Sequence, residues 1–568
     1  MISEETKTLI QPIVERGLHQ PDRLVLVFVH EDGTQERVTA GEFYREAGLF
    51  ADSLNNQGLR ADDLVIVVLK HSRELLSAFW GSLLLGSIVS IFPYLTEKLD
   101  PQLYMERVKT LVANEGARAV ITFPEFKNDL SNLLRDVDCR VISTDEVISG
   151  TKHAVDGFVP SGEYHPEKVA FLQHSSGTTG LQKGVALSHG SVLNQIRSLS
   201  QTLQFSPVDK VISWLPLYHD MGLIGGFVLP IVAGIPLILL SPFHWVRDPK
   251  ILFTYAAEHH ATLTWLPNFA FNHCVRGIRR SDIQSLDLSS LRALISCSEP
   301  VRRDSFELFL NRFQEQGIRQ GLLQASYALA ENTFAATQTV PGEPPYYDWI
   351  DIKSLQKEKY AKPTVPESDG SFPMVSNGKP IPGTEVAIAG PDGELLPDRF
   401  TGEIVLRSNC MLAGYYHRPE LTEQVMKDGW FHSGDIGYMV DGNVYVSGRM
   451  KDMIIVGGKN VFPQDLEAIA NTVSGVHPGR VVAFGVDDIK LGSEGVIMVC
   501  EVDADHIRGE EKKRIESDIR QRIVRETEVV LKELRLVNER WLIKTSSGKI
   551  ARNDNREKYL RIINNLDG

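Results

Sequence analysis

The sequence predicts an α/β protein with mainly parallel sheets over its first 335 residues, followed by a small β-rich lobe and a last part of mixed strands and helix. Apolar runs alternate with longer helical segments up to about residue 335, which is typical of strand–helix–strand units. The pattern changes near Lys451, where we expect a domain boundary. At 568 residues the chain is also too long for a single core.

Two uncharged stretches, residues 75–95 and 221–241, are long enough to raise the question of a membrane span. Glycines and prolines divide the second into a buried helix, a turn and a strand at 236–240, and the first divides into a helix at 78–85 and a strand at 88–91. With strands expected at 63–69 and 211–215, both stretches become buried strand–helix–strand units. A membrane span is the less favoured alternative.

Residues 338–376 contain six prolines and little apolar periodicity, which predicts a long insertion or lid-like segment, or else a loose surface loop. Short β segments at 384–389, 402–407 and 444–449 then predict the β-rich lobe. A charged helix is expected at about 510–530.

Charge and cysteine usage exclude some classes of function. Residues 451–568 hold 20 basic and 20 acidic side chains, so the net charge of −13 lies in the first 450 residues and argues against a nucleic-acid partner for that part. The five cysteines lack metal-binding or redox spacing, and the N-terminus has acid where a signal peptide carries base. We therefore expect a cytoplasmic protein.

The most informative motif is the loop at 175–184, which combines hydroxyls, glycines and one lysine between two apolar runs. Such a loop suits polyphosphate, because its glycines let backbone N–H groups turn inward and its lysine adds positive charge. It differs from a Walker A loop, since Lys183 precedes a glycine and the next segment, 185–187, reads as a strand. A hairpin without a ligand is the alternative.

Four further polar motifs follow in order. His219 and Asp220 come after a strand and before a helix, where open α/β sheets place ligand-binding groups. Tyr327 offers an aromatic face, and Glu331 offers a carboxylate that could bind Mg²⁺ together with phosphate oxygens. Taken alone, such a histidine is more often structural than catalytic, and the glutamate could equally be a charge on a helix face.

The last two motifs lie towards the C-terminus. Asp435 sits at a glycine turn and suits a ribose diol, although an Asx turn explains it equally well. Lys549 lies in a Ser/Gly loop that could carry it into a site, although most lysines in such loops are simply solvated.

Together, these motifs resemble the adenylate-forming superfamily of acyl- and aryl-CoA synthetases, peptide-synthetase adenylation domains and luciferases, from about residue 20 to about residue 555. The sequence is most similar to the fatty acyl-AMP ligases at 214–226, 267–270, 298–302, 460–467 and the long segment after 327–331. The resemblance implies an N-terminal domain, 1–450, of two mainly parallel α/β subdomains plus the β-rich lobe. A small mobile α+β domain, 451–568, would follow.

The resemblance also implies a role for each motif residue. Lys549 would bridge the substrate carboxylate and the α-phosphate, His219 would line the passage between them, Glu331 would bind Mg²⁺, and Lys451 would be the hinge. The remaining roles are binding of the ATP phosphates (Ser175, Ser176, Gly177, Thr178, Thr179, Gly180 and Lys183), binding of adenine and ribose (Ser298, Glu299, Pro300, Tyr327, Asp435 and Arg449), and the acyl pocket (Trp214, Met221, Gly225, Trp265 and Cys297).

The function implied by the resemblance is activation of a fatty or related apolar carboxylic acid by ATP, with Mg²⁺, to an acyl-adenylate. Transfer to the phosphopantetheine thiol of a separate acyl carrier protein would follow. The length of segment 338–376 favours this acceptor, because in acyl-AMP ligases a segment there is associated with disfavouring CoA. An acyl-CoA synthetase is the alternative, and a non-catalytic adenylate-binding relative is less favoured because Glu331, Asp435 and Lys549 are intact.

Overall fold

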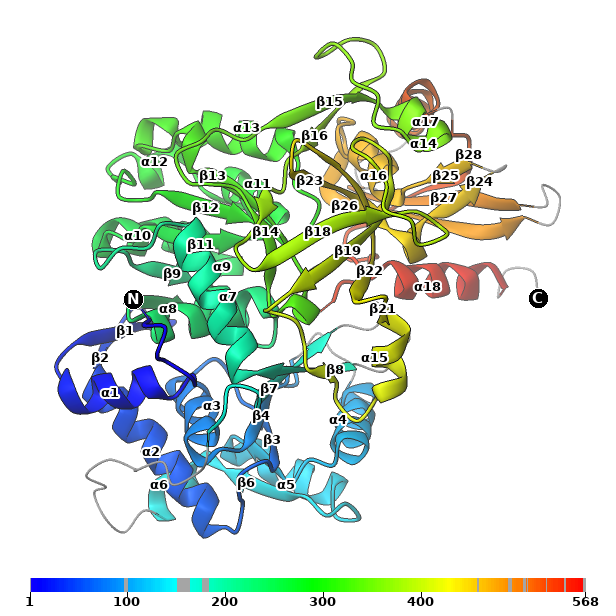
Figure 1. Cartoon of the computed structure of the whole chain (residues 1–568). Helices are drawn as coiled ribbons and strands as arrows, with labels where there is room; N and C mark the ends of the chain where they lie inside the picture. Colours follow the sequence, from blue (N-terminus) through cyan, green and yellow to red (C-terminus); the bar gives the residue numbers. More distant parts are fainter. Residues whose placement is uncertain are drawn as a thin grey trace.

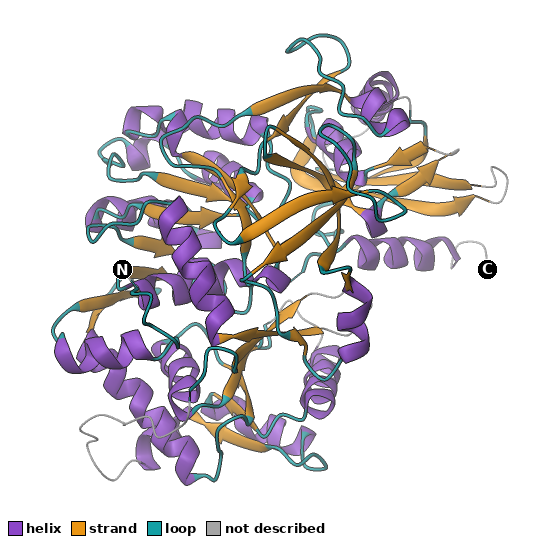
Figure 2. Cartoon of the chain, viewed as in Figure 1, coloured by secondary structure: helices purple, strands orange, loops and turns teal. Residues whose placement is uncertain are grey.

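The structure is a computed structural model that describes residues 2–96, 101–150, 164–175, 183–456, 459–488, 493–503, 507, 509–527, 529–545 and 548–564. Two large sheets with their helices form most of the N-terminal part, and the C-terminal strands and helices lie beside the β-rich lobe (Figure 1). Helices flank the strands of both large sheets, as Figure 2 shows. The predicted α/β class is confirmed.

The first large sheet has seven strands in the order β20-β8-β7-β4-β3-β5-β6. Its central strands pair in parallel, whereas β7 and β8 form an antiparallel pair. The buried side chains of α2 and α3 cover one face, and those of α4 and α5 cover the other. The bounds are β3 Leu64–Val68, β4 Ile88–Ile91, β5 Ala119–Thr122, β6 Arg140–Ser143, β7 Val169–Ser175, β8 Lys183–Ser188, β20 Gly414–Tyr415, α2 Ala40–Asn56, α3 Arg73–Leu85, α4 Pro101–Glu115, α5 Pro124–Leu133 and α6 Thr144–Gly150.

Helix α3 shows how local sequence sets these bounds. The hydroxyl of Ser72 accepts a hydrogen bond from the Leu75 N–H over 3.4 Å, which caps the start of the helix. Gly86 ends it with φ of 84°, a conformation that favours glycine. Both uncharged stretches are therefore short buried elements, as predicted.

The second large sheet has nine strands in the order β17-β14-β13-β12-β11-β9-β10-β1-β2. The strands from β13 to β1 run parallel, and the strands at both edges are antiparallel. The bounds are β1 Leu24–Val29, β2 Gln35–Thr39, β9 Val211–Ser213, β10 Leu237–Leu240, β11 Leu263–Leu266, β12 Ala293–Ser296, β13 Leu323–Ala328, β14 Ala335–Gln338, β17 Lys379–Pro380, α1 Gln11–His19, α7 His189–Thr202, α9 Pro242–Arg247, α10 Lys250–His259, α11 Asn268–Gly277, α12 Arg280–Ile283 and α13 Arg303–Phe313.

Residues 221–241 contain a π-helix, η1 (Met221–Val228), then α8 (Leu229–Ala233) and β10. A Cβ on Gly226 would lie 2.4 Å from the Ser213 hydroxyl, so the glycine lets η1 approach the sheet closely. The helix and strand are confirmed, but the π form has no sequence signal, because it arises from packing against β9. Among the described residues, no helix has the length and apolar character needed to cross a membrane.

The β-rich lobe is a twisted antiparallel sheet of β18 (Thr384–Ala389), β19 (Gly402–Ser408), β22 (Trp430–Val440), β21 (Met426–Lys427) and β23 (Asn443–Arg449). Segment 338–376 forms a hairpin of β15 (Tyr347–Asp351) and β16 (Ser371–Val375) with α14 (Ile352–Glu358) between them. Its apolar residues share a small core with Tyr438 and Tyr445 of the lobe. The segment is therefore folded onto the lobe, and its description as an insertion stays a prediction.

The C-terminal part is a three-stranded sheet of β26, β27 and β28 with helices on both faces. Helices α16 and α17 pack on one face and α18 on the other, in cores separate from those of the large sheets. The bounds are β24 Ile454–Val456, β25 Lys459–Val461, α16 Pro463–Asn471, β26 Val476–Asp488, β27 Ser493–Val502, α17 Glu510–Thr527, β28 Leu531–Val537 and α18 Arg552–Asn564.

Candidate active site

Tyr327 and Asp435 form the centre of the candidate site. The Tyr327 hydroxyl, near the end of β13, donates to Oδ2 of Asp435 over 2.7 Å. Arg449 faces Asp435 across the β22–β23 pair, with its Nε 3.1 Å from Oδ1. Asp435 raises the pKa of Arg449, and burial, followed by Asp435, raises the pKa of Tyr327 well above its ordinary value. Three predicted binding residues therefore meet in one hydrogen-bonded cluster.

The Ser298–Pro300 turn leaves the sheet at the same edge as Tyr327. Strands β12 and β13 pair in parallel up to Ser296 and Ala325, so the segments after them emerge side by side. Ser298 has φ of 66°, and the Glu299 carboxylate accepts from the Phe269 N–H over 2.9 Å. This hydrogen bond ties the Ser298–Pro300 turn to the start of α11.

The predicted phosphate loop lies between β7 and β8, whose ends pair at Ser175 and Lys183. Lys183 Nζ lies 4.8 Å from the centroid of the Tyr415 ring. Five of the predicted residues lie outside the described residues, namely Ser176, Gly177, Thr178, Thr179 and Gly180. The side chain of Ser175 lies outside them too.

Tyr415, which packs against Lys183, also contacts Glu331. The Tyr415 hydroxyl donates to Oε1 of Glu331 over 2.8 Å, and burial, followed by Glu331, raises the tyrosine pKa. Among the described hydrogen bonds, none uses Oε2 of Glu331. No group of three or more His, Cys, Asp and Glu in the described ranges could hold a metal ion. A single carboxylate oxygen therefore fits a hard cation whose other ligands come from phosphate or water.

Tyr415 is a site residue that the sequence motifs do not identify. It reaches Glu331 and Lys183 because β20 pairs with β8, with Tyr415 opposite Val185. A two-residue strand so distant in sequence gives no local signal for that pairing.

His219 precedes η1 and is half-buried, with its Nε2 atom turned away from solvent. Burial, followed by the charge of Lys549, lowers its pKa to about 3, so the imidazole is neutral at physiological pH. Its Nε2 has no hydrogen-bond partner among the described residues. Asp220 caps η1, accepting from the Met221 N–H over 2.8 Å.

Lys549, from the C-terminal part, reaches this region of the N-terminal part. Its charge acts on the pKa of His219 and also on that of Cys297, which burial raises to about 12. The turn before it is closed by the Thr545 N–H, which donates to the Lys549 carbonyl over 2.7 Å. A Cβ on Gly548 would lie 3.8 Å from the Phe269 ring, so the turn packs against α11.

Lys451 follows Arg449 in a short 3₁₀ turn, η5 (Met450–Asp452). The Lys451 side chain is exposed at the surface. The next residue, Asp452, accepts from Arg552 over 2.9 Å, and Arg552 also pairs with Glu467 at 2.6 Å. These contacts fix the turn to α16 and α18 of the C-terminal part.

The predicted acyl-pocket residues are all buried but fall into two packed groups. A Cβ on Gly225 would lie 3.2 Å from Trp265, so η1 packs directly on that indole. Trp214 stacks on Trp245 instead, with ring centroids 3.5 Å apart. Trp245 is an additional neighbour that the motifs did not reveal. Met221 and Cys297, at the start of η1 and after β12, complete the predicted set.

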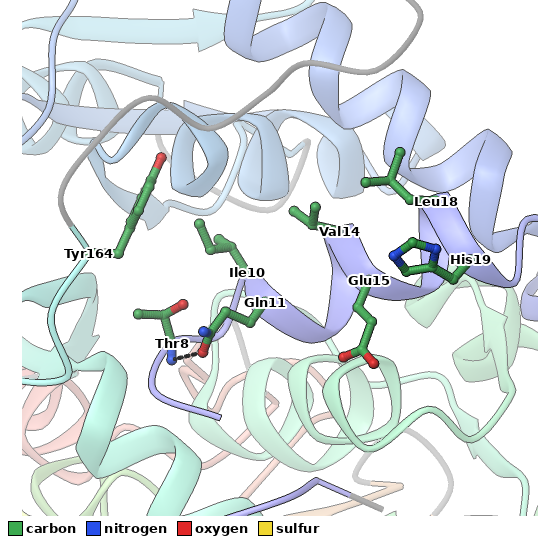
Figure 3. Close-up of a pocket in the computed structure, with 8 residues that line it drawn as sticks. All are labelled: Thr8, Ile10, Gln11, Val14, Glu15, Leu18, His19 and Tyr164. Atoms are coloured by element: carbon green, nitrogen blue, oxygen red, sulfur yellow. Dashed lines mark hydrogen bonds between the residues drawn. The ribbon is translucent and has the colours of Figure 1, made fainter. Parts of the chain in front are cut away.

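A surface groove of about 500 Å³ lies along α1, away from the lobe that carries Asp435 (Figures 1 and 3). Its lining includes Gln11, Glu15 and His19 on the exposed side of α1, and Tyr164 at one end. None of the predicted site residues lines it.

Comparison with known proteins identifies the relatives of this chain. It is 28% identical over 582 residues to the medium-chain-fatty-acid–[acyl-carrier-protein] ligase JamA of Moorena producens, covering 99% of this chain and 96% of JamA. It is also 28% identical over 578 residues to the long-chain-fatty-acid–AMP ligase FadD26 of Mycobacterium marinum, covering 96% of each.

Among solved structures, a fatty acyl-adenylate ligase from Legionella pneumophila, in complex with acyl adenylate and pyrophosphate, is 26% identical with a TM-score of 0.75. The match covers 99% of this chain and 98% of that one. A family model described as AMP-binding enzyme matches residues 14–416. The chain therefore belongs to the AMP-binding enzyme family.

Proposed function

We propose that the protein uses ATP to convert a fatty or related apolar carboxylic acid into an acyl-adenylate, and then passes the acyl group to the phosphopantetheine thiol of an acyl carrier protein. The name of JamA gives a medium-chain fatty acid and an acyl carrier protein as the partners that it ligates, and that of FadD26 gives a long-chain fatty acid and AMP. The observation that supports it most is the Tyr327–Asp435–Arg449 cluster, together with the packing of the turn before Lys549 against Phe269 of α11.

In this proposal the cluster holds the nucleoside. Tyr327 stacks on adenine beside Ser298–Pro300, while Asp435 and Arg449 bind the ribose hydroxyls. The hydrogen bond from Tyr327 and the ion pair with Arg449 already orient the Asp435 carboxylate, so little ordering is left for binding.

The phosphates lie by Lys183 and the loop before it, and Glu331 holds Mg²⁺. When bound, the cation neutralises charge on phosphate oxygens. Tyr415 supports the assignment, because it orients the Glu331 carboxylate and packs against Lys183 at once.

In the first step an oxygen of the substrate carboxylate attacks the α-phosphorus, and pyrophosphate leaves. Lys549 offsets the negative charge that builds on the attacked phosphate and on the carboxylate. His219 contributes a neutral, half-buried wall at which the carboxylate and the α-phosphate meet. The apolar side chains around Trp265 and η1 then receive the acyl chain.

In the second step the phosphopantetheine thiol attacks the acyl carbon, the thiol proton is lost and AMP leaves. We infer that the C-terminal domain, 451–568, rotates about Lys451 between the steps, removing Lys549 and admitting the thiol. Its separate hydrophobic cores support movement as a unit.

The acceptor depends on the insertion. The guanidinium of Arg302 donates to the Gln464 carbonyl of α16 over 3.0 Å and lies 5.9 Å from the Phe372 ring of β16. Arg303 pairs with Glu367 at 3.0 Å. The insertion therefore adds contacts near the interface between the two parts, which favours a carrier protein over free CoA. An acyl-CoA synthetase remains the second candidate.

We also infer a reducing compartment such as the cytoplasm, because all five cysteines are free. The direct test of adenylation is acid-dependent exchange of labelled pyrophosphate into ATP. Exchange that requires both an apolar acid and Mg²⁺ supports the proposal, and its absence across a broad acid panel would refute it.

A further inference from the structure

Three polar side chains, those of Ser90, His174 and Glu115, form connected contacts under the ends of β7 and β8. His174 is the residue before Ser175, and its Nδ1 lies 2.8 Å from the Ser90 hydroxyl on β4. Its Nε2 lies 2.9 Å from Oε2 of Glu115, the last residue of α4. The side chains of His174 and Glu115 are only 3% and 8% exposed. Both ring nitrogens therefore have partners, and the imidazole is fixed.

The same carboxylate touches the other strand. Gly184 pairs with His174 across the β7–β8 ladder, and a Cβ on Gly184 would lie 2.7 Å from Oε1 of Glu115. The Gly184 carbonyl in turn accepts from the Tyr416 N–H over 2.8 Å. One carboxylate thus contacts the pair of residues that bounds the predicted phosphate loop on both sides.

The buried Ser90–His174–Glu115 contacts are not explained by a contribution to stability alone. Burying a carboxylate costs free energy that an apolar trio of similar shape would avoid. Glu115 also ends a helix, where the helix dipole disfavours a negative charge. A fixed acid–imidazole pair does, however, set the separation and direction of two strand ends, which apolar packing sets less sharply.

We propose that Glu115, acting through His174, is a positioning residue for the binding of the ATP β- and γ-phosphates. This inference rests on the proposed function. The pair fixes the ends of β7 and β8, and with them the position from which Lys183 reaches the phosphates, before ATP binds. Its loss therefore weakens interactions with the terminal phosphates and leaves adenine and ribose binding intact.

The test compares ATP with AMP, which lacks the β- and γ-phosphates. Affinities of the whole protein for Mg²⁺–ATP and for AMP would be measured by calorimetry for wild type, Glu115→Gln and His174→Gln. We expect each variant to bind ATP about tenfold more weakly, with AMP affinity within about twofold of wild type. The double variant should lose no more ATP affinity than the single variant that binds ATP more weakly, because both side chains belong to one set of contacts.

Asp209→Asn is the matched control, because Asp209 is another buried acid, paired with Arg292 Nε at 2.7 Å and remote from β7 in sequence. It should lower the melting temperature without changing the ratio of ATP to AMP affinity. Gly184→Ala tests the same contact without removing a charge, so it remains informative if Glu115→Gln folds poorly, and it should show the same ATP-specific loss.

An unchanged ATP to AMP ratio in Glu115→Gln and Gly184→Ala, or equal losses for both nucleotides, would overturn the positioning role while leaving the proposed function standing. A wild-type protein that binds neither nucleotide would overturn the proposed function, and this inference with it.

Discussion

Asp435 and Arg449 are opposite one another on adjacent strands, and their side chains form an ion pair of 3.1 Å that the Tyr327 hydroxyl completes. The pair links β22 to the last residue of β23, which directly precedes the turn that contains Lys451. One side-chain contact thus joins the proposed nucleotide site to the strand that leads into the C-terminal part.

Asp435→Asn should weaken ATP binding by about 10- to 100-fold, because the ribose would lose a charge-assisted hydrogen bond. Equilibrium titration with ATP measures the effect. Asp441→Asn, on the exposed turn of the same hairpin, should bind ATP as wild type does. Equal binding by both variants would remove Asp435 from the nucleotide site.

Lys549→Ala should lower acyl-AMP formation on the order of 10²-fold or more and leave ATP binding largely intact, since Lys549 acts on charge that develops during the reaction. Single-turnover assays of acyl-AMP give the rate. Lys513→Ala, on the exposed face of α17, is the control. Turnover close to wild type would contradict the role of Lys549.

Glu331→Gln should raise the Mg²⁺ concentration that gives half-maximal activity by about tenfold, because a neutral amide binds a hard cation poorly. Tyr415→Phe should produce a smaller shift in the same direction, since it removes the hydrogen bond that orients the carboxylate. A Mg²⁺ titration unchanged in Glu331→Gln, relative to the control Glu343→Gln, would return Glu331 to a structural role.

Acid should destabilise the fold below pH 6.5. Burial lowers the pKa of His71 and His189 to about 4 and that of His219 to about 3, so the unfolded chain takes up these protons first. Each histidine then loses about 1.4 kcal/mol of stability per pH unit between 6.5 and its folded pKa. Asp465, whose pKa burial raises to about 6, acts in the opposite sense, but the lowered pKa values of the three histidines together outweigh it.

Melting temperatures at pH 7.5, 6.5 and 5.5 measure this dependence. We expect a much larger fall between pH 6.5 and 5.5 than between 7.5 and 6.5, and a smaller fall in His189→Gln. A melting temperature that rises on acidification would contradict the assignment of these histidines as buried and neutral.

Arg302→Ala should raise the rate of acyl-CoA formation relative to acyl transfer to a carrier protein. It removes a hydrogen bond to α16 and a contact with the insertion. Paired assays with CoA and holo carrier protein give the ratio, with exposed Arg319→Ala as the control. An unchanged ratio would count against the insertion as the determinant of the acceptor.

The sequence predicts the fold class correctly because apolar periodicity lies within short windows, whereas the roles of the motif residues stay predictions. Tyr327 and Asp435 stand in separate motifs, Arg449 is implied only by the resemblance, and the three side chains meet in one cluster. The hydrogen bond and the ion pair between them could not be predicted from the sequence, since the partners are far apart in sequence and come together only through sheet topology.

The residues that sequence reasoning missed share this origin. Tyr415 depends on the β20–β8 pairing, and Glu115 depends on where α4 ends relative to β7. The π form of η1 likewise follows from packing against Ser213 and the sheet, not from a residue pattern. Local sequence thus identifies single groups, whereas tertiary contacts decide which groups act together.

The measurement that tests the central claim most directly is mass spectrometry of the protein with ATP, Mg²⁺ and a panel of carboxylic acids, run in parallel with CoA and with a holo acyl carrier protein. The account predicts an acyl-AMP that persists with CoA and is consumed by the carrier protein. Rapid formation of acyl-CoA, or no acyl-AMP from any apolar acid, would contradict it.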